Sequence, residues 1–210
     1  MSGLSVSGER MARTATFLVA GWSGFFVMSV ELLGSRILAP YFGSGLMVWG
    51  GILTVFMTFL SLGYLLGGIL SSKNPRLWKL ACILAAEALL TLPVMASETS
   101  LESLSWMVPD PRYGSLIGSF FLFALPTTLS GMISPYAIRL LVRGVGSSGR
   151  EAGLVYFIST IGSAAGTIIT SFYLVLLLDI YQIIVALAVV SMIISSSAAL
   201  LSYKLKIHDA

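Results

Sequence analysis

Six apolar stretches, each long enough to cross a lipid bilayer, account for most of this chain. A spanning helix needs roughly 20 apolar residues, and the composition agrees, with 57% hydrophobic residues, 10% charged residues and a mean hydropathy of +0.95. The sequence predicts an all-α integral membrane protein with a transmembrane domain over residues 15–203, a segment 1–14 before it and a tail 204–210 after it. The lone Cys82 falls inside the third stretch, where we expect a packing thiol. The predicted spans are Ala15–Leu38, Leu46–Leu70, Leu77–Ala96, Gly114–Ser134, Gly153–Leu178 and Tyr181–Tyr203.

The charges of the connections alternate, and this alternation predicts an orientation. The N-terminal segment, the second and fourth connections and the C-terminal tail carry bases, whereas the third and fifth connections carry acids and one base, Arg112. Because positively charged loops stay on the cytoplasmic side, we expect both termini to be cytoplasmic in a multi-pass protein of the inner (plasma) membrane. The net charge of +3 then reflects topology and not nucleic-acid binding. The bases are Arg10, Arg13, Lys73, Arg76, Lys79, Arg139, Arg143, Arg150, Lys204 and Lys206, and the acids are Glu98, Glu102, Asp110 and Asp179.

Three ionisable residues lie inside the predicted spans, where lipid anchoring has no use for them. Glu31 and Arg36 belong to the first span and Glu87 to the third, and an ionised side chain there costs on the order of a few kcal/mol unless it is paired or hydrated. At about 1.5 Å per residue, Glu31 lies several Å outside the midplane and Glu87 near the centre, whereas Arg36 can snorkel to the outer boundary. A spacing of five residues disfavours a Glu31–Arg36 pair, so we expect partners on other helices. A buried carboxyl without a cation usually stays protonated, which leaves Glu87 as either a silent hydrogen-bonded acid or a proton or cation site.

Small residues gather on one face of two predicted spans. In the second span, two glycines four residues apart form a GxxxG pattern that permits close approach of another helix. In the fifth span, small and hydroxyl-bearing residues recur every three or four positions, so they share a face that either packs against a neighbour or lines a polar path. We expect the glycines of both faces to support self-association. These residues are Gly63 and Gly67 in the second span and Ser159, Gly162, Ser163, Gly166 and Thr170 in the fifth.

The second connection carries a glycine-then-basic pattern from Gly67 to Lys79. It resembles the loop between the second and third helices of major facilitator superfamily transporters, except that Ser71 or Ser72 stands where that loop has an acid. The same bases also fit a simple positive-inside anchor.

The end of the fourth span predicts a break in the helix. Gly131 and Pro135 interrupt the apolar run, and Arg139 and Arg143 follow four residues apart on one face. This pattern is typical of a short amphipathic helix at the cytoplasmic interface, with anionic lipid headgroups as its partners.

Four segments form a larger pattern between residues 17 and 178. They are Glu31-Leu-Leu-Gly-Ser-Arg36-Ile-Leu-Ala-Pro40-Tyr-Phe-Gly43-Ser with Val48-Trp49, Leu62-Gly-Tyr64 with Gly67-Gly68, Gly131-Met-Ile-Ser-Pro135-Tyr-Ala-Ile-Arg139-Leu, and Tyr156 with Ser159-Thr160-Ile-Gly162-Ser163-Ala-Ala-Gly166-Thr167. The pattern resembles the membrane domain of fused spermidine synthase-like proteins, in which a six- or seven-helix, facilitator-like unit precedes a soluble aminopropyltransferase-type domain. The printed sequence contains no glycine-rich nucleotide loop or acidic cofactor residue of that soluble domain. The resemblance therefore implies the membrane unit and not the synthase, and we expect no enzyme activity, cofactor or metal.

Together these observations favour a transporter built as a six-helix bundle resembling half of a major facilitator transporter. Two copies would form a twelve-helix homodimer that works by alternating access. The expected solute is small and cationic, like a polyamine, because the buried acids are anionic and the resemblance implies polyamine chemistry. The alternative is a non-transporting membrane anchor or scaffold for an aminopropyltransferase-like partner. The predicted substrate-binding residues are Glu31, Arg36, Tyr64, Glu87, Ser159 and Ser163.

Overall fold

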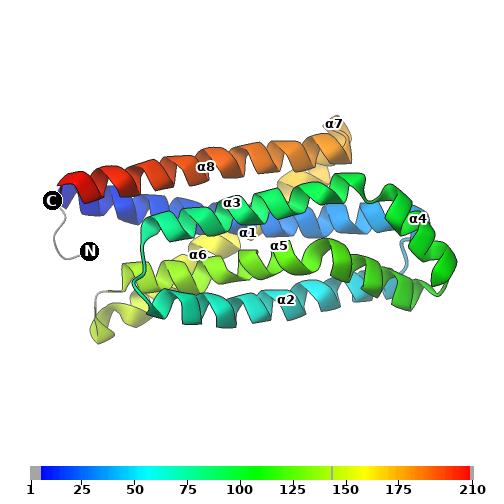
Figure 1. Cartoon of the computed structure of the whole chain (residues 1–210), viewed down its shortest axis with the longest axis horizontal. Helices are drawn as coiled ribbons and strands as arrows, with labels where there is room; N and C mark the ends of the chain where they lie inside the picture. Colours follow the sequence, from blue (N-terminus) through cyan, green and yellow to red (C-terminus); the bar gives the residue numbers. More distant parts are fainter. Residues whose placement is uncertain (1–5, 143, 209–210) are drawn as a thin grey trace.

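The computed structural model describes residues 6–142 and 144–208, and long helices make up nearly all of them (Figure 1). Six helical segments within this part of the chain are long and apolar enough to cross a membrane, as the sequence predicts. The first is longer than expected, since its helix begins at Val6 and continues through Pro40 to Phe42. The elements are α1 (Val6–Phe42), α2 (Leu46–Ser72), α3 (Leu77–Thr91) with the 3₁₀ turn η1 (Leu92–Ala96), α4 (Glu98–Met107), α5 (Pro111–Leu141), α6 (Val145–Ile169) with the π turn η2 (Thr170–Leu174), α7 (Val175–Leu177) and α8 (Ile180–His208).

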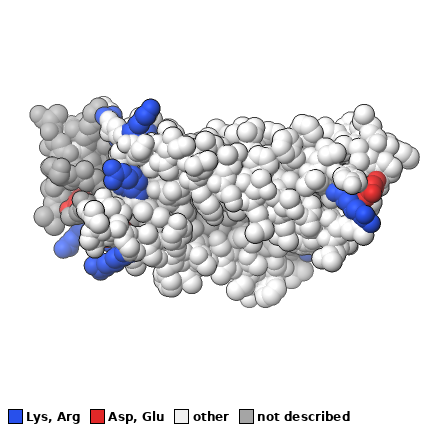
Figure 2. Space-filling model, turned by 90° about the horizontal axis from the view of Figure 1, so that it is seen from below, with Lys and Arg blue, Asp and Glu red and all other residues white. Residues whose placement is uncertain are grey.

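The ends of the bundle separate the connections as the charge pattern predicts. The start of α1, the end of α8 and the α2–α3 and α5–α6 connections lie at one end, and α4 and α7 lie at the other (Figure 1). Figure 2 shows Lys and Arg side chains gathered mainly at the first of these ends. The structure therefore confirms that successive connections lie at opposite ends of the bundle. The side of the membrane that each end faces stays a prediction.

The predicted break after the fourth span is wrong. α5 runs without interruption through both Pro126 and Pro135, and Arg139 belongs to its last turn instead of a separate interfacial helix. Prolines are tolerated in transmembrane helices because neighbouring helices and hydroxyl side chains satisfy the backbone around them. The Oγ of Ser130 lies 3.2 Å from the carbonyl oxygen of Pro126, within this continuous part of α5. Arg143 lies outside the described residues.

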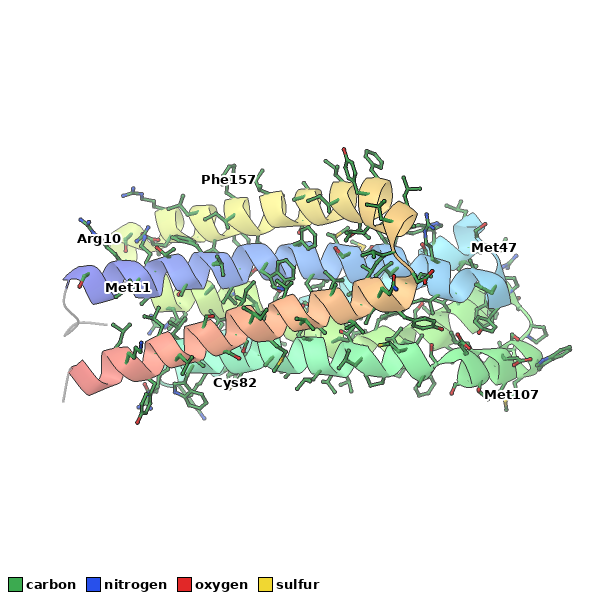
Figure 3. All side chains as sticks on the ribbon, turned by 90° about the horizontal axis from the view of Figure 1, so that it is seen from above. Arg10, Met11, Met47, Cys82, Met107 and Phe157 are labelled. Atoms are coloured by element: carbon green, nitrogen blue, oxygen red, sulfur yellow. The ribbon has the colours of Figure 1, made fainter. Side chains whose placement is uncertain are left out.

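Three local features modify the predicted spans. Pro93 lies at the start of the 3₁₀ turn η1, where the regular α-helix of the third span ends. The short helix α4 follows it in a region that the sequence pattern leaves as a loop, and α4 buries only Leu101. The third span also exposes Cys82 at the surface of α3 (Figure 3), so the expectation of a packing thiol is wrong.

The packing of the helices follows an internal two-fold pattern. The bundle consists of two three-helix units, α1–α2–α3 and α5–α6–α8. The second helix of each unit packs against the first helix of the other unit, so that α2 contacts α5 and α6 contacts α1. The third helices α3 and α8 contact each other, α3 also contacts α5, and α8 also contacts α1. α1 and α5 run in opposite directions (Figure 1), so the two units are related as an inverted repeat.

The glycines of the two swapped contacts occupy equivalent positions. A Cβ at Gly63 or Gly67 would collide with the backbone of α5, and a Cβ at Gly162 or Gly166 would collide with the backbone of α1. Two constant offsets in numbering, 99 residues between α2 and α6 and 107 residues between α1 and α5, relate three contacts of the first interface to three of the second. The matched contacts are Gly63–Thr128 with Gly162–Gly21, Gly67–Met132 with Gly166–Phe25, and Leu60–Gly131 with Ser159–Gly24.

These contacts correct one prediction and confirm another. The glycine faces of α2 and α6 are used inside the chain, so they are not free to support self-association. The small-residue face of the fifth span packs against a neighbouring helix, which is one of the two alternatives that the sequence left open.

Candidate functional site

Glu87 of α3 lies near the middle of the third span (Leu77–Ala96), between the two apolar clusters that fill the bundle. Leu80 and Leu84 of α3 belong to the cluster nearer the chain termini, and Ala88 belongs to the cluster nearer α4. The side chain of Glu87 is 0% exposed. The sequence therefore placed this acid correctly at the centre of the bundle.

Two hydroxyls reach the carboxylate of Glu87 from two different helices. Ser130 of α5 donates to Oε1 at 2.5 Å, and Ser23 of α1 donates to Oε2 at 3.5 Å. The first distance is typical of a short bond between a hydroxyl and a charged oxygen, and the second is at the limit of a hydrogen bond. No described cation pairs with Glu87, so hydroxyl groups alone satisfy this acid.

The two serines are equivalent residues of the internal repeat. Ser23 directly precedes Gly24 in α1, and Ser130 directly precedes Gly131 in α5. Gly24 permits the close approach of α6 and Gly131 that of α2, while the serine beside each glycine faces Glu87 of α3. Sequence reasoning missed both serines, because Ser-Gly pairs also occur elsewhere in the chain, as at Ser44-Gly45, and only the helix contacts distinguish these two.

Glu31 is the second acid of the interior, and its surroundings differ. It lies on α1, is 7% exposed and accepts no hydrogen bond from a described side chain. It follows Ser23 by eight residues, or about 12 Å along the helix axis. Glu31 and Glu87 therefore belong to two separate places in the bundle.

Arg36 gives Glu31 no support. Its side chain is exposed near the end of α1, as snorkelling predicts, and it forms no ion pair or hydrogen bond with another described residue. The expected partners on other helices are thus absent from the described part of the chain, for Arg36 and for Glu31 alike.

The remaining predicted site residues lie on α2 and α6. Tyr64 is 49% exposed on α2, within electrostatic range of Tyr156 on α6. Ser163 is partly buried and donates to the carbonyl of Gly24 at 3.2 Å, while the backbone of Ser159 also contacts Gly24. The two serines therefore contribute to the α1–α6 contact, and they do not converge on Glu87.

One ion pair that sequence reasoning missed fastens α6 to α1 at the end that carries the chain termini. Arg13 approaches the carboxylate of Glu151 through both terminal nitrogens, with Nη1–Oε1 at 3.0 Å and Nη2–Oε2 at 2.9 Å. The guanidinium also lies over the ring of Phe17, at 5.2 Å from its centroid. The sequence reading treated Arg13 only as a topogenic charge, and the distance of 138 positions hid its partner.

Two open grooves lie toward the α4 end of the bundle. A groove of about 440 Å³ separates α4 and η1 from α5, and a second of about 340 Å³ lies between α2 and α5. Neither borders Glu31 or Glu87. Their walls are mainly apolar, with serines of α4 in the first and threonines of α2 in the second. The lining residues include Ser97, Ser100, Ser103, Gly118 and Phe121 in the first groove and Thr54, Thr58 and Phe120 in the second.

The described residues contain no group of three His, Cys, Asp or Glu side chains that could hold a metal ion. Comparison of the chain with protein-family models, with curated proteins and with solved structures finds no match.

Proposed function

We propose that this chain is a membrane transporter of a small cationic, polyamine-like solute, and that two copies work together by alternating access. The observation that carries the proposal is the inverted repeat of three helices, with its matched glycine contacts between α2 and α5 and between α6 and α1. Inverted repeats of this kind recur in secondary transporters, including each half of the major facilitator fold.

Glu31 is the residue that we assign to the solute. A carboxylate that is nearly buried and lacks a described partner is unfavourable by itself, and a bound ammonium group would supply the missing counter-charge and hydrogen bonds. Tyr64 of α2 is 49% exposed, and an aromatic ring of this kind can stack on a cation. The segment from Glu31 to Arg36 also resembles the membrane domain of fused spermidine synthase-like proteins.

A second copy would complete the transporter, because six helices form only half of a twelve-helix assembly. α6 is the least enclosed span, with 11% of its apolar window buried against 61% for α1. Its outer face carries Tyr156, Phe157 and Ile161, and Figure 3 shows Phe157 projecting away from the bundle. We assign the homodimer contact to this face, since the glycine faces are already used within the chain.

A non-transporting anchor or scaffold for an aminopropyltransferase-like partner is the second candidate. The burial of Glu87 and its hydrogen bonds to Ser23 and Ser130 favour this role, because an acid held in this way can serve only to join the helices. This role predicts no response of the protein to any small solute.

A thermal-shift screen on the purified protein separates the two candidates. Transport predicts that spermidine raises the unfolding temperature, whereas a neutral analogue of similar length and a dicarboxylate do not. Glu31→Gln should abolish the shift, and Glu102→Gln, which neutralises an exposed acid of α4, should preserve it. If spermidine leaves the unfolding temperature of the native protein unchanged, the scaffold role gains over transport.

The proposed orientation, with both termini cytoplasmic in the plasma membrane, has its own test. Ser100 of α4 and Ser148 of α6 are exposed at opposite ends of the bundle. In a Cys82→Ala background, a cysteine at Ser100 should react with a membrane-impermeant reagent added outside the cell, and one at Ser148 should not. Labelling of the Ser100 position from the cytoplasm alone would overturn the topology.

A further inference from the structure

We propose that Glu87 is a proton-binding site that couples transport to a proton gradient, separate from the solute site at Glu31. This inference rests on the proposed function, and it assigns different roles to the two buried acids. It is carried by the position of the Glu87 carboxyl between Ser23 of α1 and Ser130 of α5.

The surroundings of Glu87 fit a proton better than a larger cation. The side chain is 0% exposed, and its described partners are two hydroxyl oxygens. Hard metal cations take about six or more oxygen ligands, and an organic ammonium group has no room beside a side chain that is 0% exposed. A proton needs one oxygen and no added space.

The elements around Glu87 bring no competing charge to it. α1 faces it with Ser23, and α5 faces it with Ser130. α8, which packs on α3, uses Ser195 for a bond to the carbonyl of Ala81. Among the described residues, no charged or titratable side chain acts on the carboxyl. Its charge is therefore set by its own proton.

Ser130 provides the means by which a proton on Glu87 changes α5. Its hydroxyl lies 2.5 Å from Glu87 Oε1 and 3.2 Å from the carbonyl oxygen of Pro126, and it has a single hydrogen to donate. With Glu87 ionised, that hydrogen bonds the carboxylate. When a proton binds Oε1, the new O–H of Glu87 donates to Ser130 Oγ, and the Ser130 hydrogen turns to the Pro126 carbonyl.

Binding of the proton thus replaces the hydrogen bond from Ser130 to Glu87 by one from Ser130 to the Pro126 carbonyl of α5. Only an O–H bond at Glu87 forms, and it breaks again when the proton leaves. Because α1 and α5 are equivalent helices of the inverted repeat, a change at Glu87 acts on both units at once. Glu31 lies two turns farther along α1, so the same helix reaches the solute site.

Transport assays in proteoliposomes test this assignment with spermidine as the probe. Glu87→Gln keeps the shape of the side chain and removes its proton exchange, so accumulation of spermidine driven by a pH gradient should fall to the level without a gradient. Exchange of labelled for unlabelled spermidine at equal pH should continue in this variant. Glu31→Gln should lose both activities. Gradient-driven accumulation by Glu87→Gln at the native level would overturn the proposal.

An infrared titration of the purified protein makes the test independent of transport. The native protein should show a carboxylic C=O band that disappears as the pH rises and that is absent from Glu87→Gln at every pH. If the native protein moves no spermidine, the proposed function fails, and the band still decides whether Glu87 binds a proton. A native spectrum indistinguishable from that of Glu87→Gln at every pH would refute the proton site.

Discussion

The two three-helix units share a frame but not their chemistry. Both admit the swapped helix at glycines in equivalent positions, and both turn one serine of the first helix toward Glu87. The unpaired acids of the interior, Glu31 and Glu87, nevertheless belong to the first unit, and Ile138 occupies the position in α5 that is equivalent to Glu31.

The second unit does hold a buried acid, and the contrast is instructive. Glu151 of α6 is paired with Arg13 of α1, whereas Glu31 has no described partner and Glu87 has only hydroxyls. A symmetric frame explains how the chain folds. Glu31 and Glu87 do not follow this symmetry, and unpaired acids in the interior cost stability. We therefore infer that they are kept for function.

The largest expected effect comes from breaking the shared frame. Gly63→Leu and Gly162→Leu each force a side chain into the backbone of the facing helix, and we expect each to destabilise the protein by about 3 kcal/mol. Equilibrium unfolding of the detergent-solubilised protein measures this loss. Gly68→Leu and Gly153→Leu are the matched controls, because a Cβ at either position meets no atom within 4 Å. If only one of the two interface variants unfolds more readily, the frame is not symmetric.

The next effect separates the two unpaired acids by stability. Glu87→Ala leaves a cavity and removes the hydrogen bonds from Ser23 and Ser130, so we expect a loss of about 2 kcal/mol. Glu31→Ala removes no described hydrogen bond and should cost less than half of that. The same unfolding measurement compares them, and equal losses would contradict the difference in their surroundings.

The third effect separates the acids by solute affinity. Glu31→Gln should weaken spermidine binding by about 1 kcal/mol or more, or roughly fivefold, through loss of a charge-assisted hydrogen bond. Isothermal titration calorimetry measures this change, and the unfolding temperature without solute should remain native. Glu102→Gln serves as the control for neutralising an acid. A native affinity in Glu31→Gln would remove Glu31 from the solute site.

The smallest effect tests the pair of equivalent serines. Ser130→Ala removes the shorter bond to Glu87 and should cost about 0.6 kcal/mol, which is the average found for hydrogen bonds between membrane helices. Ser23→Ala removes a bond of 3.5 Å and should cost close to nothing. Unfolding of the single variants and of the double variant decides this, and a larger loss from Ser23→Ala would reverse the assignment.

Sequence reasoning predicted the spans well because their signal is local. Twenty consecutive apolar residues identify a helix without knowledge of its neighbours, and the alternating bases and acids place the connections at opposite ends. The depth of Glu87 follows from counting residues along such a helix.

The partners of the helices are not local, and there the sequence predictions failed or stayed open. The glycines of α2 and α6 permit close packing against any helix, so the pattern did not reveal that the contacts lie within the chain. Ser23 and Ser130 resemble many other serines until the glycine contacts reveal their equivalence. Pro135 predicted a break because proline disrupts isolated helices, whereas the neighbouring helices hold α5 together.

The uptake of radiolabelled spermidine into proteoliposomes tests the transport assignment most directly. The account predicts saturable uptake by the native protein, above that of empty liposomes and above that of vesicles carrying Glu31→Gln at the same protein content. Uptake by the native protein that equals the empty-liposome level would contradict it, and the frame of two inverted units would then serve a membrane scaffold.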